Sequence, residues 1–295
     1  MDQELQLRLR RVLTAMENLL PKPAMPVNWE VSKAAVWRRH ALSGSLYPVN
    51  EGTAIGLCDL LGIERQKDTL LENTRQFLAG FPANNVLLWG TRGTGKSSLV
   101  RALLQAYSLE GLRLVQVDKG DLVNLPDIVD EIRDKPYRFI IFADDVSFES
   151  GDSSHKMLKR ALDGSVYAPP ENALIYVTSN RRYLLPEYES DNRGAMMVNN
   201  EIHHGESIEE KISLSGRFGL WIGFHPFTQD QYVDVARQWT EKVAVQNGLA
   251  FEWSADVAIE AVDWSHLKGD RSGRIAWQFA NQWVGRAMLN RRSSG

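Results

Sequence analysis

A glycine-rich loop between an apolar run and a helical pattern restricts the fold of this chain more than any other feature. The loop reads Gly90-Thr91-Arg92-Gly93-Thr94-Gly95-Lys96-Ser97 and matches G-x-x-x-x-G-K-[ST] at every specified position. The apolar run 86–89 precedes it, and a helical pattern follows from Lys96 to about Tyr107. Backbone amides of such a loop, with the N-terminus of the next helix, point at negative charge. The sequence therefore predicts a strand, loop and helix that bind nucleotide phosphates.

Two side chains of this loop have specific predicted roles. Lys96 should reach the β- and γ-phosphates, and the Ser97 hydroxyl should ligate Mg²⁺. Ser98, the next residue, is counted with the loop as a phosphate contact. A glycine turn without a ligand is the alternative, and the flanking strand and helix argue against it.

The rest of the central region alternates between strand and helix patterns. Strands are predicted at 113–117, 139–143 and 173–178, and helical stretches near 64–79, 120–134 and 153–163. Strands separated by helices indicate a parallel sheet covered on both faces. The expected fold class is α/β, with an αβα P-loop core.

The ends of the chain have a different character. Residues 3–20 predict an amphipathic helix, and 27–55 show no clean period, so we expect residues 1–54 to be an N-terminal helical extension and linker. Residues 55–228 form the expected core. Beyond 228 the patterns are helical at 231–246, 255–262 and 273–289, which predicts a small C-terminal helical lid over 229–295. Within the core, 189–207 is expected to be a long exposed or disordered loop.

Two adjacent carboxylates follow the apolar strand that ends at Ala143. Asp144 should help to hold Mg²⁺ through water, and Asp145 can polarise an attacking water. Glu149 is an alternative base, although a solvated loop acid is its more ordinary role.

The next predicted strand also ends in polar residues. Asn180 lies at its tip, which is beside the γ-phosphate if the sheet is parallel. It can hydrogen-bond the γ-phosphate or position the water, with Thr178 and Ser179 as neighbouring candidates.

Three arginines are candidates for closing the site. Arg217 precedes an apolar segment on a turn, from which it can reach a neighbouring subunit's nucleotide; a structural salt bridge is the alternative. Arg274 opens a predicted helix of the lid and can touch the phosphates, and Arg271 is the second candidate there.

Composition excludes several other classes of function. The net charge of -3 gives no global attraction to nucleic acid, no apolar run is long enough for a membrane helix, and Cys58 is the only cysteine. A reduced, cytoplasmic location is therefore expected. Four of the six histidines, at 203, 204, 225 and 266, are candidate ligands but lack the spacing of a ligand set, so Mg²⁺ is the only metal expected.

The motifs, in this order and followed by a helical segment, resemble the AAA+ superfamily of ATPases, with Walker A, Walker B, sensor 1, arginine finger and sensor 2. More narrowly, the stretches 63–67, 82–88, 136–139, 178–182 and 214–219 look like a bacterial AAA+ family, DUF815. The resemblance implies an αβα ATPase core, a helical lid, and ATP bound between subunits of a homo-oligomer. It also implies that Ile63 contacts the adenine. Most hydrolysing members carry Glu where this chain has Asp145.

The resulting hypothesis is an ATPase that couples hydrolysis of ATP to conformational change or remodelling of a macromolecular partner, either protein or DNA. Asp145 in place of Glu leaves the turnover rate open, so a slow ATP-dependent switch, loader or adaptor is the alternative. A P-loop kinase is a weaker third reading, because a kinase needs neither a trans arginine nor a sensor-2 arginine.

Overall fold

The computed structural model describes residues 6, 8, 10–11, 25–39, 44–49, 55–148, 152–163, 170–182, 184, 196–198, 201–203 and 214–293. Most of the predicted helix 3–20 and of the predicted loop 189–207 lies outside these residues, as does Glu149. Two short strands are present within 189–207, and they pair antiparallel as β7 (Met196–Val198) and β8 (Glu201–His203).

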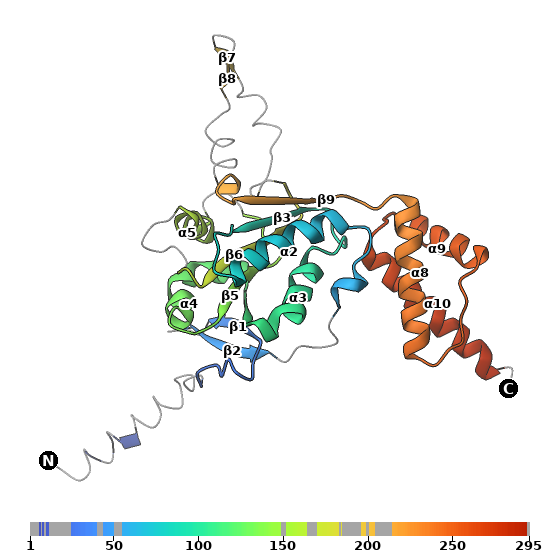
Figure 1. Ribbon diagram of the computed structural model, residues 1–295, viewed down its shortest axis with the longest axis horizontal. Helices are drawn as coiled ribbons and strands as arrows, with labels where there is room; N and C mark the ends of the chain where they lie inside the picture. The colour runs from blue at the N-terminus through green and yellow to red at the C-terminus, as the bar shows by residue number, and fades with distance from the viewer. Residues whose placement is uncertain are drawn as a thin grey trace.

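A seven-stranded sheet forms the centre of the molecule, in the order β2-β1-β4-β5-β6-β3-β9 (Figure 1). Its neighbouring strands are parallel except for the antiparallel pair β1 and β2 at one edge. The strands are β1 (Ala34–Arg39), β2 (Gly44–Val49), β3 (Val86–Gly90), β4 (Leu112–Val117), β5 (Arg138–Ala143), β6 (Ala173–Ser179) and β9 (Leu220–Phe224). The predicted parallel sheet is confirmed.

Helices cover both faces of this sheet, because the central strands bury side chains on both sides. Along β3, Val86 and Leu88 belong to one hydrophobic cluster, whereas Leu87 between them belongs to the other. The first cluster includes residues of α2 (Glu64–Leu78) and α3 (Lys96–Tyr107). The second includes residues of α4 (Leu125–Ile132) and α5 (Ser153–Leu162). A strand buried on both faces reads as a continuous apolar run, which is why the sequence predicted these strands.

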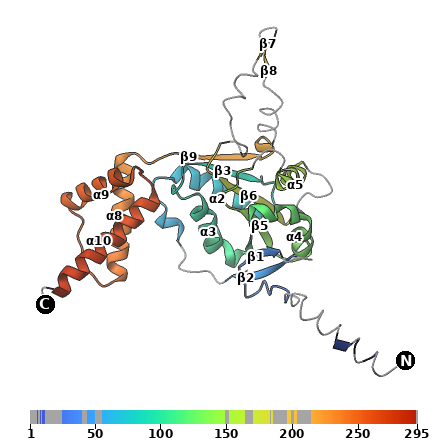
Figure 2. The same ribbon diagram turned by 180° about the vertical axis from the view of Figure 1, so that it is seen from behind.

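Three helices after β9 form a separate group beside the sheet, at the opposite end of the molecule from β1 and β2 (Figure 2). They are α8 (Gln229–Gln246), α9 (Ala255–Lys268) and α10 (Gly273–Ser293). Local signals set their ends: Thr228 and Gln231 form a capping box at the start of α8, and Ser254 caps α9. Their positions agree with the three helices predicted for the lid.

The N-terminal region differs from the sequence expectation. The segments Ala34–Arg39 and Gly44–Val49, which we expected in an extension and linker, form β1 and β2 and enlarge the sheet, with β1 parallel to β4. Burial explains the difference: Trp37 is 2% exposed, and its indole occupies the space where a Cβ on Gly44 would stand. Trp37 is therefore a packing residue. No periodicity revealed these strands because their apolar residues are interrupted: β1 ends in two arginines, and β2 contains a glycine, a serine and a proline.

Two further elements were not predicted as such. The apolar segment after Arg217 forms β9, which pairs with β3 at the other edge of the sheet. The helix expected near 120–134 consists of a 3-10 helix (Lys119–Asn124) followed by α4. No helix of the described residues is long and apolar enough to cross a membrane.

Candidate nucleotide-binding site

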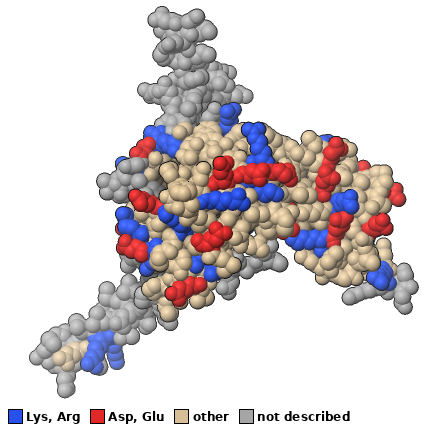
Figure 3. Space-filling view, in the orientation of Figure 1, with Lys and Arg blue, Asp and Glu red and all other residues tan. Residues whose placement is uncertain are grey.

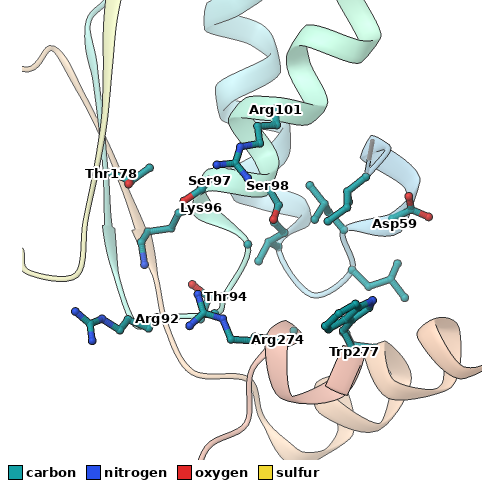
Figure 4. Close-up of a pocket in the computed structure, with 18 of the residues that line it drawn as sticks. Asp59, Arg92, Thr94, Lys96, Ser97, Ser98, Arg101, Thr178, Arg274 and Trp277 are labelled. Atoms are coloured by element: carbon teal, nitrogen blue, oxygen red, sulfur yellow. The ribbon is translucent and has the colours of Figure 1, made fainter. Parts of the chain in front are cut away.

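A cavity of about 720 Å³ lies between the glycine loop, the carboxyl ends of β5 and β6, and the lid. Its size is within the range of small-molecule sites. Figure 4 shows Arg92, Lys96 and Ser97 along its core side, and Arg274 and Trp277 of α10 on the lid side. The predicted residues that line it are Ile63, Arg92, Gly93, Thr94, Gly95, Lys96, Ser97, Ser98, Asp144, Asp145, Asn180 and Arg274.

The glycines of the loop are required by close contacts with other elements. Gly90 has φ 126°, and a Cβ there would stand 1.9 Å from the carbonyl oxygen of Phe224 in β9. The Thr91 amide donates to that same carbonyl at 3.1 Å, so the start of the loop, directly after β3, is hydrogen-bonded to the edge strand β9. Gly95, with φ 101°, is the N-cap of α3. Only glycine adopts such angles at low cost, so the sequence pattern has a direct conformational reason.

Lys96 is 7% exposed, and its Nζ donates to the carbonyl oxygens of Gly90 and Thr91, both at 2.7 Å. A longer contact of 3.4 Å joins it to Oδ1 of Asn180. Burial lowers the pKa of Lys96 from its usual 10.5 to about 8, and nearby Asp145 and Asp144 offset this only in part. The ammonium group therefore lies where the glycine loop leaves the sheet. A bound anion could replace the carbonyl oxygens of Gly90 and Thr91 as its hydrogen-bond acceptors.

Both oxygens of Asp144 have partners. Oδ1 accepts from the Ser97 hydroxyl and from the Thr178 hydroxyl, each at 2.5 Å. Oδ2 lies 3.7 Å from the guanidinium of Arg101 on α3. Ser97 and Asp144, the two residues predicted to hold magnesium, are thus brought together from two different elements.

Asp145 has a left-handed backbone, with φ 51°, which is uncommon for a residue other than glycine. Its amide donates to the Thr178 hydroxyl at 2.8 Å, and its Oδ1 accepts from Nδ2 of Asn180. Its Oδ2 also lies 3.7 Å from Arg92 of the glycine loop. The predicted water-polarising acid and the predicted γ-phosphate contact are therefore direct neighbours.

The lid contacts the glycine loop through the backbone. The Arg274 amide donates to the Gly93 carbonyl at 3.2 Å. Gly93 has φ 77°, and a Cβ there would lie 2.6 Å from Oγ of Ser272. The first turn of α10 thus packs directly on the loop, which carries the Arg274 side chain to the cavity. Arg271, the second candidate, contributes its backbone carbonyl as an acceptor for the Phe227 amide.

Gly90, Thr91 and Arg217 do not line the cavity. The first two act as acceptors for Lys96, as described above. Arg217 lies on the turn before β9, and its Nε pairs with Asp163 at the end of α5. Within the described part of this chain, Arg217 therefore takes no part in the cavity.

Of the apolar part of the cavity, the sequence predicted only Ile63. Phe227, Trp239 and Trp277 also line it. Sequence reasoning also missed Arg101, and it treated Thr178 as one of several candidates. The signals available were spacing on helices: Arg101 lies about one turn after Ser97, and Trp277 about one turn after Arg274. Among the described residues, no cluster of three histidine, cysteine or acidic side chains could hold a metal.

A parallel sheet in this strand order, a glycine loop after β3, polar residues at the ends of β5 and β6, and a helical lid define the P-loop AAA+ fold. Within that class, residues 30–287 match the model of the family described as "Protein of unknown function (DUF815)". The chain belongs to this family, as the resemblance predicted. A search of the curated proteins found no match.

Solved structures with the same fold include those of two kinds of protein, RuvB and Orc1. Two single-site mutants of RuvB from Thermotoga maritima align with TM-scores of 0.55 and 0.53 at 17% identity; each alignment covers 81% of this chain and 67% or 66% of theirs. Orc1 from Aeropyrum pernix, solved in complex with DNA, aligns with a TM-score of 0.51 at 18% identity, covering 79% of this chain and 61% of Orc1. The chain thus spans about two thirds or less of these proteins, and at such identities the likeness concerns the fold.

Proposed function

We propose that this protein binds ATP with Mg²⁺ and hydrolyses it, and that hydrolysis changes the position of the lid relative to the core. One observation carries the proposal: a single cavity joins Lys96, the pair Ser97 and Asp144, the pair Asp145 and Asn180, and Arg274. These groups come from the loop, two strand ends and the lid, so the folded chain alone brings them together.

The residues fit a nucleotide with its metal. The amides of the loop and the N-terminus of α3 suit phosphate oxygens, and Lys96 and Arg274 add positive charge from opposite sides of the loop. The Ser97 hydroxyl and the Asp144 carboxylate supply the hard oxygen groups that Mg²⁺ prefers, and the metal would neutralise charge on the phosphates. Ile63 at the apolar end suits a base.

Asp145 is the proposed general base. Asn180 orients the Asp145 carboxylate through the hydrogen bond to Oδ1, and both groups are placed to align a water with the γ-phosphate.

Asp145 also favours a second candidate function, a slow switch that binds ATP tightly and turns over rarely. Asp is one methylene shorter than Glu, and Arg92 pairs with it. The rate of turnover separates the two candidates.

Arg217 is proposed to act in a neighbouring copy. It lies away from its own cavity, at the turn before an edge strand, and its pair with Asp163 holds the side chain on the surface of the core. An arginine supplied in trans would make hydrolysis depend on assembly of a homo-oligomer.

The proposed output is remodelling of a macromolecular partner. The Orc1 structure with DNA makes nucleic acid one candidate class, and protein is the other. On the face seen in Figure 3, lysines and arginines are interspersed with acidic residues over the described core and lid. A mixed surface of this kind favours neither class. A cytoplasmic location stays part of the proposal because Cys58 is the only cysteine of the sequence.

Phosphate release measured over a range of protein concentrations tests the proposal. We expect wild-type activity per subunit to rise with concentration, and Lys96→Ala and Arg217→Ala each to remove it. Tight ATP binding with negligible release at every concentration would favour the switch, and phosphate transferred to an added metabolite would favour a kinase. A wild-type chain that binds no ATP would overturn the proposal.

A second experiment addresses the macromolecular partner. A pull-down with the Asp145→Asn variant in the presence of ATP, in which hydrolysis is expected to be blocked, should recover the partner.

A further inference from the structure

Trp277 lines the cavity from the lid, yet 48% of it remains exposed. An indole that is half exposed at the edge of a cavity can bury further surface against a bound group, which is favourable. It lies three residues after Arg274 on α10, so the two side chains share one face of the helix. Figure 4 shows them side by side at the lid edge of the cavity.

Part of the cavity lining is apolar and lies against the glycine loop. Leu60, Leu61 and Ile63 belong to it, and a Cβ on Gly95 of the glycine loop would lie only 3.3 Å from Cδ1 of Ile63. Lys67 fixes this segment by donating from Nζ to the carbonyl oxygen of Leu60 at 3.2 Å. A flat apolar group placed here would therefore continue directly from a group bound at the glycine loop.

Trp277 differs from the other aromatic residues of the cavity. Phe227 is 6% exposed and belongs to the main hydrophobic cluster, and Trp239 packs against that cluster. Their presence in the cavity wall follows from core packing. Trp277 is not among the residues of that cluster or those described as packed against it, so the hydrophobic core does not hold its side chain.

We propose that the indole of Trp277 stacks on the base of the bound nucleotide and is the main residue through which the lid recognises that base. The inference rests on the proposed nucleotide site and extends it. Every base has a π face, so stacking gives affinity for the base as a flat ring. The larger ring system of a purine would cover more of the indole than a pyrimidine.

A consequence concerns the lid. The first turn of α10 would contact the phosphates through Arg274 and the base through Trp277 at the same time. A complete nucleotide would then contact the lid through both residues, whereas a phosphate chain without a base would contact it through Arg274 alone.

Calorimetric titration of the full chain with ATP and with inorganic tripolyphosphate, both with Mg²⁺, tests the inference. Stacking on one base changes affinity by about tenfold to a hundredfold when the aromatic ring is removed. We expect Trp277→Ala to raise the Kd for ATP by that factor and to leave the Kd for tripolyphosphate unchanged. Trp277→Phe should retain most of the affinity for ATP.

Leu267→Ala is the matched control, because Leu267 is an apolar residue of the lid that is 78% exposed and does not line the cavity. It should change neither Kd. An unchanged Kd for ATP in Trp277→Ala would overturn the inference and would point to a surface that meets another copy. Equal weakening of both ligands would also overturn it, because the effect would then come from displacement of Arg274. A wild-type chain that binds neither ligand would instead contradict the nucleotide site itself.

Discussion

Thr178 connects the two acidic residues of the site. Its hydroxyl donates to Oδ1 of Asp144 and accepts from the amide of Asp145, and the residue is 1% exposed. A hydroxyl is the one group of this size that can do both. The uncommon backbone of Asp145 depends on that second hydrogen bond, so the direction of its carboxylate depends on a buried neighbour that has no acidic or basic chemistry of its own.

Replacing this hydroxyl with a methyl group should therefore separate binding from chemistry. We expect Thr178→Val to reduce phosphate release about tenfold to a hundredfold, as a displaced catalytic group does, with the Kd for ATP nearly unchanged. Thr178→Ser, which keeps the hydroxyl, should retain activity. Single-turnover phosphate release and equilibrium binding provide the two measurements, and full activity of the valine variant would show that Asp145 is oriented by other means.

Lys96 predicts a dependence of binding on pH. Its pKa of about 8 in the folded chain means that the ammonium form, which attracts phosphate, becomes scarce as pH rises above 8. We expect the Kd for ATP to rise between pH 8 and 9.5 in the wild type, and the rise to be absent in Lys96→Arg, whose side chain stays charged. Calorimetry at several pH values measures this.

The same shift has a consequence for stability. A lysine whose folded pKa lies below its unfolded pKa of 10.5 releases its proton first in the folded state, so the unfolded state binds more protons between pH 8 and 10.5. The contribution of Lys96 to the free energy of unfolding should therefore rise with pH in that window. Lys96→Met should lack this rise, and denaturant unfolding at pH 7.5 and 10 compares the two chains.

At the scale of elements, the lid is attached to the core near the apolar part of the cavity as well as at the glycine loop. Lys242 of α8 forms a 2.6 Å ion pair with Asp59 of the short 3-10 helix at Leu57–Asp59. Gln238, one turn earlier on α8, donates to the carbonyl oxygen of Cys58 at 2.8 Å. Asp59 is 11% exposed in its side chain and Lys242 33%, so the pair is partly shielded from solvent.

This attachment should slow the exchange of nucleotide. We expect Lys242→Met to increase the dissociation rate of a fluorescent ATP analogue roughly fivefold, which corresponds to about 1 kcal/mol. Arg237→Met is the control on the same helix, because Arg237 pairs with Glu241 on α8 alone. Stopped-flow displacement measures both rates, and equal rates for the two variants would mean that the ion pair does not restrain the lid.

The sequence predicted those elements whose pattern is set locally. β3, β5 and β6 are apolar over nearly their whole length, so the sequence alone identifies them as strands. Because parallel strands end at one edge of the sheet, the polar residues that follow these strands could be predicted to lie together in one site. β1 and β2 were not predicted, because their burial depends on contacts between strands, such as that of Trp37 with Gly44. The place of Trp277 in the cavity was not predicted for a related reason: the packing of α10 on Gly93 decides which face of this helix lines the cavity.

For the whole molecule, the proposed role of Arg217 predicts that two inactive variants complement each other. Lys96→Ala loses the phosphate site but keeps Arg217, and Arg217→Ala has the reverse defect. In a mixed oligomer, some intact phosphate sites meet an intact arginine; random mixing at equal concentrations gives this for about a quarter of sites. We expect ATPase activity to reappear on mixing and to be absent from each variant alone.

The control for this experiment is a chain that carries both substitutions. Mixed with Lys96→Ala, it supplies no intact phosphate site, so no activity should return. Asp163→Asn tests the local role of the pair, because it removes this ion pair and keeps the Arg217 side chain. Mixtures that stay inactive, with Asp163→Asn equally inactive, would assign Arg217 to the structure of its own subunit.

The hydrogen bond from the Arg274 amide to the Gly93 carbonyl has a mechanical consequence. It fixes one end of α10 at the phosphate loop, and the helix extends over 21 residues from there. At 1.5 Å per residue the far end lies about 30 Å away, so a rotation of about 10° at Gly93 moves that end by about 5 Å. A small rotation of α10 at the glycine loop would thus become, at the C-terminal end of the helix, a displacement of about one helical turn.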